Sequence, residues 1–440
     1  MKQSSRRTFL GQAGVGLAFP FVAKTSWAQK PPSETVRHVS FGGGGMAGAD
    51  VGAISSHPKV TVAAVVEIDP GRRNKIQQRF RDATIYADWR EMLDKEAKNL
   101  DTANVSVPDH MHAPMAMSAM LHGLHVYCQK PLTHDVYESR VLAKYAKKRG
   151  LATQMGIQIH SNSEYRTAVK LVHDGVIGKV KEAHSFSNKR WGDSNPKPNK
   201  KDPIPDGFNW EHWLGPAPYT DYIKGYYHPS QWRKRLDYGT GTFGDMGCHI
   251  YDPVFKSLGL TYPISLKSTG PKPNKDNWGF DAKIHYIFPN TPYSADKTLP
   301  VTWYDGGARP PKKVQALLEG KGLPGQGSIV IGTKGTMLIP HVGHPQLFPK
   351  KDFADFKIEK VPAVNHWHSF IDAARGEGEA SANFDYSGPL SETVLLGGVA
   401  TRFPNETLKW ESEKLAFAGN DKATSLIRKT YRQGWEVEGL

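Results

Sequence analysis

Two short motifs contain polar residues that could act on an alcohol. Asp245 and His249 are four positions apart, so they share one face if their segment is helical. A histidine can take an alcohol proton near neutral pH, and a carboxylate one turn away can orient it. Lys130, before Pro131, could polarise or position a hydroxyl. On spacing alone, however, a capping aspartate, a buried histidine and a plain loop lysine explain these motifs better.

A glycine run at residues 42–48 predicts a dinucleotide site. Two registers of the G-x-G-x-x-G/A fingerprint fit the run, namely Gly42, Gly44 and Ala47, or Gly43, Gly45 and Gly48. We favour the first register, because the predicted strand Val39–Phe41 leads directly into Gly42. Glycines allow the backbone to turn tightly and to approach a pyrophosphate at a helix N-terminus. We expect Gly42, Gly44, Gly45 and Ala47 to contact the cofactor.

An acidic residue follows the second predicted strand, as the fingerprint requires. Glu67 could accept hydrogen bonds from ribose hydroxyls and repel a 2′-phosphate, which favours NAD over NADP. Arg72 and Arg73 follow closely and could accommodate a phosphate, so NADP is the less favoured alternative. An exposed acid at a strand end would also explain Glu67.

Further polar residues follow later strands of the same predicted sheet. Pro108, Asp109 and His110 come after one strand and Lys130 after the next, at the edge where ligands bind in such sheets. We predict that Pro108, His110 and Lys130 contact the cofactor. His110 and His112 have no carboxylate or cysteine at ligand spacing, so we expect no metal site.

Alternating strand-like and helix-like segments must position these residues. Residues 37–155 predict a doubly wound parallel sheet of the Rossmann type. Its strands are expected at Val39–Phe41, Val60–Val66, Thr102–Val107, His125–Cys128 and Ala152–Gly156, and its helices at Met46–Ser56, Glu91–Ala97, Ala113–Leu121 and Val136–Lys148.

The pattern changes in the second half of the chain. A helix at Ser163–His173 is followed by strands separated by long loops, which predicts an α+β domain with an open, mostly antiparallel sheet. The strands are expected at Lys181–Ser187, Asp281–Phe288, Val301–Tyr304 and Ser328–Ile339, and the later helices at Asn365–Arg375, Pro389–Thr401 and Asp421–Gln433. The stretch Ser194–Asp206 is predicted to be a surface loop near a site.

The net charge of +14 does not indicate nucleic-acid binding. Residues 1–28 contribute four basic residues and no acid, which leaves +10 on the remainder. The remaining basic residues lie in short mixed runs without an arginine-rich arm. We therefore expect a solvated basic surface and no nucleic-acid partner.

The N-terminus has the pattern of an export signal. Arg6 and Arg7 form a twin-arginine signature, an apolar stretch follows, and Ser26-Trp27-Ala28 resembles a cleavage site. We predict that residues 1–28 are a signal peptide read by the twin-arginine machinery and that the mature protein is periplasmic. A disordered basic N-terminus is the alternative. The apolar stretch is too short to span a bilayer, so we expect no stable membrane anchor.

Cys128 and Cys248 are the two cysteines. An oxidising compartment permits one disulfide bridge, but both residues lie in apolar sequence. Two buried free thiols are the favoured prediction.

Taken together, the motifs resemble those of the Gfo/Idh/MocA oxidoreductase family over almost the whole mature chain. The resemblance rests on the glycine turn, Pro108-Asp109-His110, Gln129-Lys130-Pro131, Gly156-Ile157-Gln158, the Trp210–Pro218 stretch, Trp232-Arg233, Asp245-x-Gly-x-His249, Gly332–Gly335 and Tyr431–Trp435. It implies a Rossmann domain at residues 35–158 and a substrate and oligomerisation domain at residues 159–440.

The resemblance also assigns roles to residues. The catalytic lysine, aspartate and histidine of the family map onto Lys130, Asp245 and His249. Gln129 departs from the usual glutamate, which puts details of cofactor binding at that position in doubt but leaves the lysine in place. His228, Trp232 and Arg233 are candidate substrate contacts, and a homodimer or homotetramer is expected by analogy.

These expectations define three candidate functions. An exported enzyme has no ready pool with which to exchange its cofactor. The leading hypothesis is therefore hydride transfer on a sugar, cyclitol or glycoside with a tightly held, internally recycled NAD, as in glucose–fructose oxidoreductase-like members. The alternative is redox-neutral glycoside hydrolysis by oxidation, elimination, hydration and reduction, as in NAD-dependent glycosidase-like members. A non-catalytic carbohydrate-binding relative is the third.

Overall fold

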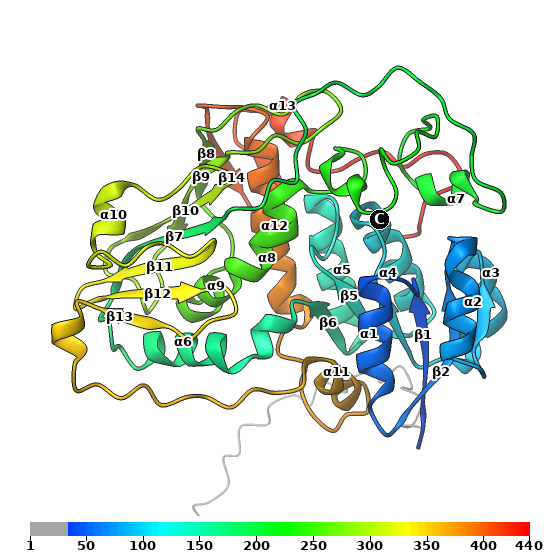
Figure 1. The fold of residues 1–440 in the computed structure, drawn as a ribbon, viewed down its shortest axis with the longest axis horizontal. Helices are drawn as coiled ribbons and strands as arrows, with labels where there is room; N and C mark the ends of the chain where they lie inside the picture. Colours follow the sequence, from blue (N-terminus) through cyan, green and yellow to red (C-terminus); the bar gives the residue numbers. More distant parts are fainter. Residues whose placement is uncertain (1–33) are drawn as a thin grey trace, which may run out of the picture. The chain divides into compact units, whose positions relative to one another are not determined.

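The computed structural model describes residues 34–440. The predicted signal peptide at residues 1–28 lies outside this part of the chain. The described residues contain two sheets, one on each side of a central group of helices (Figure 1).

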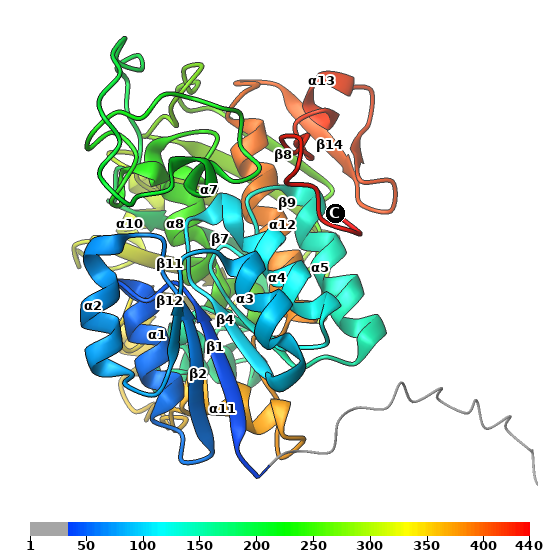
Figure 2. The same cartoon turned by 90° about the vertical axis from the view of Figure 1, so that its right-hand side faces the viewer.

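The first sheet is parallel and has the strand order β3-β2-β1-β4-β5-β6, which confirms the predicted Rossmann architecture. Its strands are β1 (Val36–Phe41), β2 (Val60–Val66), β3 (Thr84–Tyr86), β4 (Thr102–Val105), β5 (His125–Gln129) and β6 (Thr153–Gly156). The chain reverses its direction across the sheet between β1 and β4, so their carboxyl ends border a crevice in which ligands bind in such folds. Figure 2 shows the helices that cover this sheet.

The helices of this half are α1 (Met46–Ser55), α2 (Pro70–Arg79), α3 (Trp89–Glu96), η1 (Ala97–Asn99), η2 (Asp109–Met111), α4 (His112–Leu121) and α5 (Val136–Arg149). Three of the helices of this half, α2, α3 and α5, begin at a capping aspartate. Asp135 and Glu138 form a capping box at the start of α5, and Gly150 ends that helix in the left-handed conformation. Sequence reasoning missed α2 and β3, because α2 is almost wholly polar and β3 has only three residues.

The second sheet has nine strands in the order β13-β12-β11-β7-β10-β9-β8-β14-β15. Only β7 and β10 pair in parallel among these strands, so the predicted mostly antiparallel sheet is confirmed. The strands are β7 (Val180–Ser187), β8 (Ser265–Ser268), β9 (Lys283–Pro289), β10 (Thr298–Asp305), β11 (Gln326–Gly332), β12 (Thr336–Pro340), β13 (Gln346–Phe348), β14 (Thr407–Glu411) and β15 (Ala416–Phe417).

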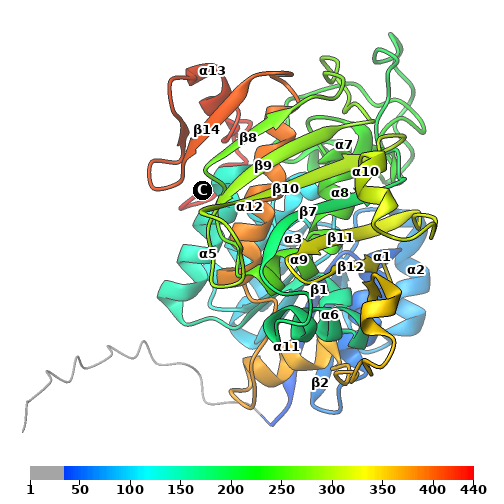
Figure 3. The same ribbon diagram turned by 90° about the vertical axis from the view of Figure 1, so that its left-hand side faces the viewer.

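Helices pack on the face of this sheet that is turned toward the Rossmann half, and the strands lie in front of them in Figure 3. The helices of this half are η3 (Gln158–Ser161), α6 (Ser163–His173), α7 (Trp210–Leu214), η4 (Gln231–Lys234), α8 (Gly241–Ile250), α9 (Asp252–Leu258), α10 (Lys312–Ala316), η5 (Lys350–Phe353), α11 (His366–Ala374), α12 (Phe384–Ala400) and α13 (Asp421–Thr424).

Three predicted elements were wrong in extent. The single strand expected at Ser328–Ile339 is a hairpin of β11 and β12, because Gly332 and Gly335 allow a tight reversal between them. The helix expected at Asp421–Gln433 ends at Thr424. The helix expected from Pro389 begins at Phe384, because the Asn383 side chain caps it by accepting from the Tyr386 N–H.

One continuous apolar core joins the two sheets. Within it, Arg140 of α5 and Glu392 of α12 form a two-pronged ion pair, Nε to Oε2 at 3.0 Å and Nη2 to Oε1 at 2.8 Å. Cys128 and Cys248 are buried and free, as predicted. Across residues 34–440, every helix is too short or too polar to cross a bilayer.

Candidate functional site

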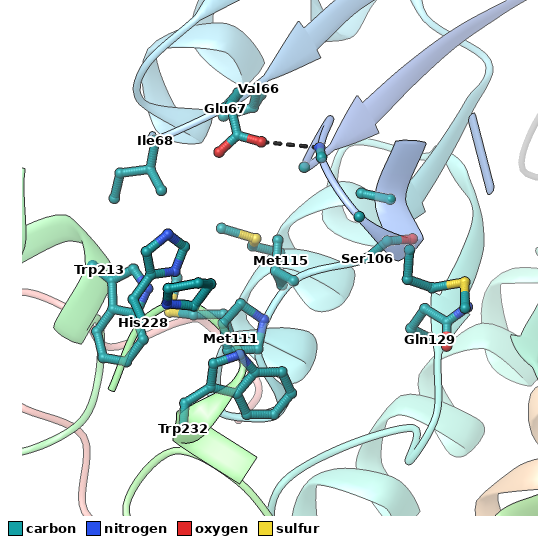
Figure 4. A pocket seen from close by; sticks show the side chains of 18 of the residues that line it. Val66, Glu67, Ile68, Ser106, Met111, Met115, Gln129, Trp213, His228 and Trp232 are labelled. Carbon is teal, nitrogen blue, oxygen red and sulfur yellow. Dashed lines mark hydrogen bonds between the residues drawn. The ribbon is translucent and has the colours of Figure 1, made fainter. Parts of the chain in front are cut away.

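A cleft lies at the carboxyl ends of β1, β2, β4 and β5. Its Rossmann side is formed mainly by residues 42, 44–47, 66–68, 106–109 and 129–130, and its other side by residues of the segment 212–233. Figure 4 shows Glu67 and Ile68 on one wall and Trp213, His228 and Trp232 on the opposite wall. All the predicted cofactor-binding residues except His110 line this cleft.

The glycine turn at the base of the cleft leaves space for a phosphate group. Gly42 follows β1 directly with φ +96°, and a Cβ atom there would lie 2.7 Å from the Ser106 carbonyl oxygen. Gly45, with φ +56°, precedes the first residue of α1, and no side chain caps that helix. The first N–H groups of α1 therefore remain open toward the cleft, which suits a pyrophosphate.

Glu67 is held against this turn by backbone amides. Its Oε2 accepts from the N–H groups of Gly43 and Gly44 at 3.2 and 3.1 Å, and its Oε1 accepts from the Asp69 N–H at 3.0 Å. Each carboxylate oxygen can accept more than one hydrogen bond. The buried carboxylate is thus fixed in place and can still accept from ribose hydroxyls, which fits NAD.

Arg72 reaches the same cleft but is engaged by an acid. Its Nε lies 3.1 Å from Oδ2 of Asp69, and its guanidinium lies over Gly44. His228 approaches the same Asp69 oxygen at 3.3 Å from the opposite wall. Of the two arginines that the sequence offered for a 2′-phosphate, Arg72 is therefore paired with Asp69, and Arg73 donates to the carbonyl oxygens of Glu67 and Ile68.

The segment 207–235 covers the cleft from the second half of the chain. Its stacked rings, Trp210 on Trp213 at 4.8 Å, form part of a separate aromatic core. Besides the His228 contact, His212 Nδ1 lies 3.5 Å from Oδ2 of Asp88. The two histidines connect the covering segment to the Rossmann wall at two separate points.

Lys130 and Asp245 meet at the end of the cleft. Lys130 follows β5, and its Nζ donates to Oδ1 of Asp245 at 2.7 Å and to the Asp245 carbonyl oxygen at 2.8 Å. Arg233 donates from Nε to the same Oδ1 at 3.1 Å. Burial alone would raise the pKa of Asp245, but the charges of Lys130 and Arg233 outweigh it and hold the pKa well below 3.8.

His249 lies one helical turn beyond Asp245 on α8. Burial first, and then the charge of Lys130, lower its pKa well below 6.5, so the ring is neutral at pH 7. Its Nδ1 is buried without a hydrogen-bond partner among the described residues. Of the three residues predicted to be catalytic, Lys130 and Asp245 are thus in direct contact, and His249 follows one helical turn after Asp245 with an unpaired Nδ1.

His110 is placed differently from the other predicted cofactor contacts. It is fully buried, its Nε2 is 2.9 Å from the Trp213 carbonyl oxygen, and its ring packs edge-on against Tyr238. It supports the wall of the cleft without lining it. Pro108, by contrast, lines the cleft directly.

Two residues beside the site were not identified in the sequence analysis. Asp50 of α1 accepts from Gln129 Nε2 at 2.8 Å, and no sequence motif around Asp50 indicates a functional role for it. His341, after β12, lies against His249. Both are lone residues whose neighbours come from distant parts of the chain.

The comparisons with known proteins agree with this geometry. The model of the oxidoreductase family NAD-binding Rossmann fold, named GFO_IDH_MocA, matches residues 36–157, and the model of the C-terminal alpha/beta domain of that family matches residues 162–292. Together they cover more than half of the chain. The chain belongs to the Gfo/Idh/MocA oxidoreductase family, and the part of the chain that contains the first sheet is the NAD-binding domain of that family.

Individual relatives are distant. The levoglucosan dehydrogenase of Pseudarthrobacter phenanthrenivorans is 23% identical over 44% of this chain and 42% of the relative. A 2,7-anhydro-N-acetylneuraminate hydratase of Mediterraneibacter gnavus is 27% identical over 35% of this chain and 40% of the relative. The matched regions thus span less than half the length of these curated relatives.

Solved structures share the fold over a larger part of the chain. The WlbA dehydrogenase from Bordetella pertussis, solved with NADH and UDP-GlcNAcA, has a TM-score of 0.60 and 14% identity, covering 86% of this chain and 99% of that chain. A levoglucosan dehydrogenase solved with NADH and L-sorbose has a TM-score of 0.59 and 16% identity, covering 86% and 99%.

Proposed function

We propose that this protein is a NAD-dependent oxidoreductase that acts on a CH–OH group of a sugar, cyclitol or glycoside. The observation that carries the proposal is the 2.7 Å contact between Lys130 and Asp245 at the end of the dinucleotide cleft, with the neutral His249 one turn away. Two of the relatives, the levoglucosan dehydrogenase and the 2,7-anhydro-N-acetylneuraminate hydratase, support a carbohydrate substrate.

Each residue of the group has a separate role. His249 takes the hydroxyl proton as the alcohol is oxidised, because its ring is neutral at pH 7 and has a free nitrogen. Lys130 donates to the same oxygen and stabilises negative charge as it develops there. Asp245 holds the lysine in position. When bound, NAD supplies the hydride acceptor for this reaction.

Arg233, Trp232 and His228 line the cleft and are proposed substrate contacts. Arg233 donates a hydrogen bond from Nε to Asp245, and its guanidinium lies 4.3 Å from the centroid of the Trp232 ring. An indole face suits the apolar face of a sugar ring. His228 also faces the ribose end through Asp69, so its role is shared between cofactor and substrate.

We further propose that the cofactor is loaded before export, held tightly and recycled within each catalytic cycle. The twin-arginine signature predicts a periplasmic protein, where free NAD cannot be regenerated readily. The covering segment 207–235 supports retention, because it forms one wall of the cleft and contacts the other through His228 and His212. A dimer or tetramer remains an expectation by family analogy.

The test is to purify the mature protein without added nucleotide and to identify the released ligand by absorbance and mass spectrometry. Bound NAD, reduced when sugars or cyclitols are added, is the expected result. An empty cleft that turns over only with added NAD would sink the recycling proposal but would leave the oxidoreductase proposal standing. A protein that neither binds nor reduces NAD would be a carbohydrate-binding relative, which the Lys130–Asp245 contact argues against.

Redox-neutral glycoside hydrolysis is the second candidate, and the hydratase among the relatives favours it. In this scheme oxidation of one carbon acidifies the neighbouring C–H, the glycosidic substituent is eliminated, water adds, and the ketone is reduced. Incubation with glycosides in deuterated water distinguishes the two. Deuterium beside the anomeric carbon supports elimination, whereas accumulation of oxidised and reduced sugars without deuterium supports coupled redox chemistry.

A further inference from the structure

The end of the chain contacts elements of both halves of the molecule beside the cleft. After α13, residues 429–435 contact α5, α7 and α3 in turn, and Figure 1 shows this red stretch running from α13 to the side of α7. We call residues 429–435 the C-terminal strap. The strap includes the Tyr431–Trp435 motif, and among the described residues that line the cleft none belongs to it. Any effect of the strap on the cleft is therefore transmitted through other elements.

The strap begins at the first turn of α5, in the Rossmann half. The backbone N–H of Lys429 donates to Oδ2 of Asp135 at 3.3 Å, and its Nζ lies 3.3 Å from Oε1 of Glu138. The hydroxyl of Tyr431 donates to the same Glu138 oxygen at 2.6 Å. Asp135 and Glu138 are the two residues of the α5 capping box, so the strap starts from a fixed part of the helix.

Arg432 of the strap binds the end of α7 in the covering segment. Its Nε and Nη2 donate to the Gly215 carbonyl oxygen at 3.1 and 3.0 Å, and Nη2 also donates to the Glu211 carbonyl oxygen at 2.9 Å. Its Nη1 forms an ion pair with the Glu211 carboxylate. The last carbonyl groups of a helix lack donors within the helix, and an arginine can supply them. One guanidinium thus holds the short helix that presents His212 and Trp213 to the cleft.

Trp435 connects the strap to the Rossmann half a second time. The guanidinium of Arg90 in α3 lies 4.1 Å from the centroid of its buried ring, and the ring of His212 meets it edge-on at 6.0 Å. Asp88, which lines the cleft and precedes α3, lies 3.5 Å from Nδ1 of the same His212. Trp435 therefore packs against one residue from each side of the cleft, beside the contact that joins the two sides.

We propose that the C-terminal strap restrains the covering segment and so sets the rate at which NAD enters and leaves the cleft, with Arg432 and Trp435 as its positioning residues. The inference rests on the proposed function, in which NAD is held tightly, and it names residues that hold the cleft closed. The covering segment forms one side of the cleft, so it must move away for a dinucleotide to pass. That movement breaks the contacts of Arg432 with α7 or those of Trp435 with α3. These contacts join protein to protein, so they act on the empty and the loaded cleft alike.

Exchange of the bound cofactor measures this restraint without any substrate. The protein is loaded with NADH and mixed with excess NAD, and the loss of energy transfer from tryptophan to NADH gives the dissociation rate constant. Arg432→Ala should release NADH faster by roughly 10-fold to 100-fold, the usual effect of losing hydrogen bonds to a charged group. Trp435→Ala should release it faster by at least about 5-fold, because it loses a cation–π contact and apolar packing. The association rate constant should rise in both variants, so Kd should change less than either rate constant.

Arg428→Ala is the matched control for these variants. Arg428 precedes the strap, lies 4.1 Å from the centroid of the Tyr137 ring and donates to the Leu440 carbonyl oxygen at 2.9 Å, so it should leave both rate constants unchanged. Arg432→Lys keeps the charge but not the branched set of donors, and Trp435→Phe keeps an aromatic ring. Both should give rates between those of the wild type and the alanine variants. They also keep the test decisive if an alanine variant does not fold.

The outcomes separate the strap from the proposed retention of NAD. Release at the wild-type rate from folded Arg432→Ala and Trp435→Ala proteins would overturn the inference, even if the wild type holds NAD tightly. A lower urea midpoint of the nucleotide-free variants with unchanged rate constants would show a merely structural role and would overturn it too. Rapid release from the wild type would contradict the proposed retention, whereas still faster release from the variants would support the strap. A protein that binds no NADH would contradict both.

Discussion

Gln129 donates from its Nε2 to Oδ2 of Asp50 at 2.8 Å, and its Oε1 accepts from the backbone N–H of Lys130 at 3.2 Å. Asp50 is completely buried and also accepts from the indole of Trp367 at 2.9 Å and from Ser106 at 2.8 Å. Burial raises the pKa of Asp50 despite these donors. The amide is therefore suited to this position, since a glutamate there would place a second carboxylate against the first.

Gln129→Glu should destabilise the protein. The change replaces a hydrogen-bond donor to Asp50 with an acceptor and places two buried acids in contact. The free energy of unfolding at neutral pH should therefore fall by about 3 kcal/mol. Urea denaturation followed by tryptophan fluorescence measures it. Adding Asp50→Asn should restore most of the loss, because the new amide can donate to Glu at 129. Equal stability of the wild type and the single variant would contradict the charge argument.

Gly42→Ala should empty the cofactor cleft. An alanine at φ +96° is strained, and its Cβ would lie 2.7 Å from the backbone carbonyl oxygen of Ser106, which cannot move aside easily. We expect a loss of stability of about 1–3 kcal/mol and little or no NAD in the purified protein. Gly123→Ala is the matched control, because that residue has φ +83°, an open Cβ position and no place in the cleft. If both variants retain NAD equally, the close approach of Gly42 to the Ser106 carbonyl oxygen is not required for NAD binding.

Much of the site could be predicted because it follows from local rules. The glycine turn, Glu67 and Lys130 each lie directly after a strand, and the carboxyl ends of parallel strands meet at one edge of a sheet. The spacing of Asp245 and His249 likewise fixes a shared helical face. These relations depend on chain order and periodicity alone.

The residues that escaped prediction depend on tertiary contacts. Asp50 and Gln129 are 79 positions apart, and His341 meets His249 only because the β11–β12 hairpin lies across α8. The hairpin itself was predicted as one strand, since its apolar residues continue on both sides of the turn. The position of segment 207–235 over the cleft could not be predicted either, because its aromatic residues also form a local core.

Lys130→Met should abolish reduction of the bound cofactor while leaving NAD in place. Among the described residues, Lys130 and Arg233 are the two side chains that donate to Oδ1 of Asp245. The variant removes the first of these donors, and with it the charge beside the reacting oxygen. We expect single-turnover NADH formation, read at its absorbance band, to fall by roughly 100-fold to 10,000-fold. Lys189→Met removes an exposed charge of a residue that does not line the cleft and should have a much smaller effect. A rate for Lys130→Met within a few-fold of the wild type would remove the lysine from the reaction.

His38 predicts how stability depends on pH. Its ring is completely buried in β1, with Nδ1 2.8 Å from the Thr102 hydroxyl and Nε2 2.8 Å from Oδ1 of Asn104. Burial lowers its pKa from 6.5 to about 4, although the hydrogen bond to Asn104 opposes the shift. As the pH falls through 6.5, the unfolded chain gains a proton on this residue and the folded protein does not.

The free energy of unfolding should therefore decrease between pH 6.5 and about 4 and level off below, once the folded state is also protonated. The contribution of His38 over this interval is about 3 kcal/mol, at roughly 1.4 kcal/mol per pH unit. His38→Gln retains a donor and an acceptor without a titrating group, so its stability curve should be shallower by that slope. Urea denaturation across the interval measures both curves, and other buried histidines affect them equally. Parallel curves for the two proteins would show that His38 is protonated in the folded state as readily as in the unfolded chain.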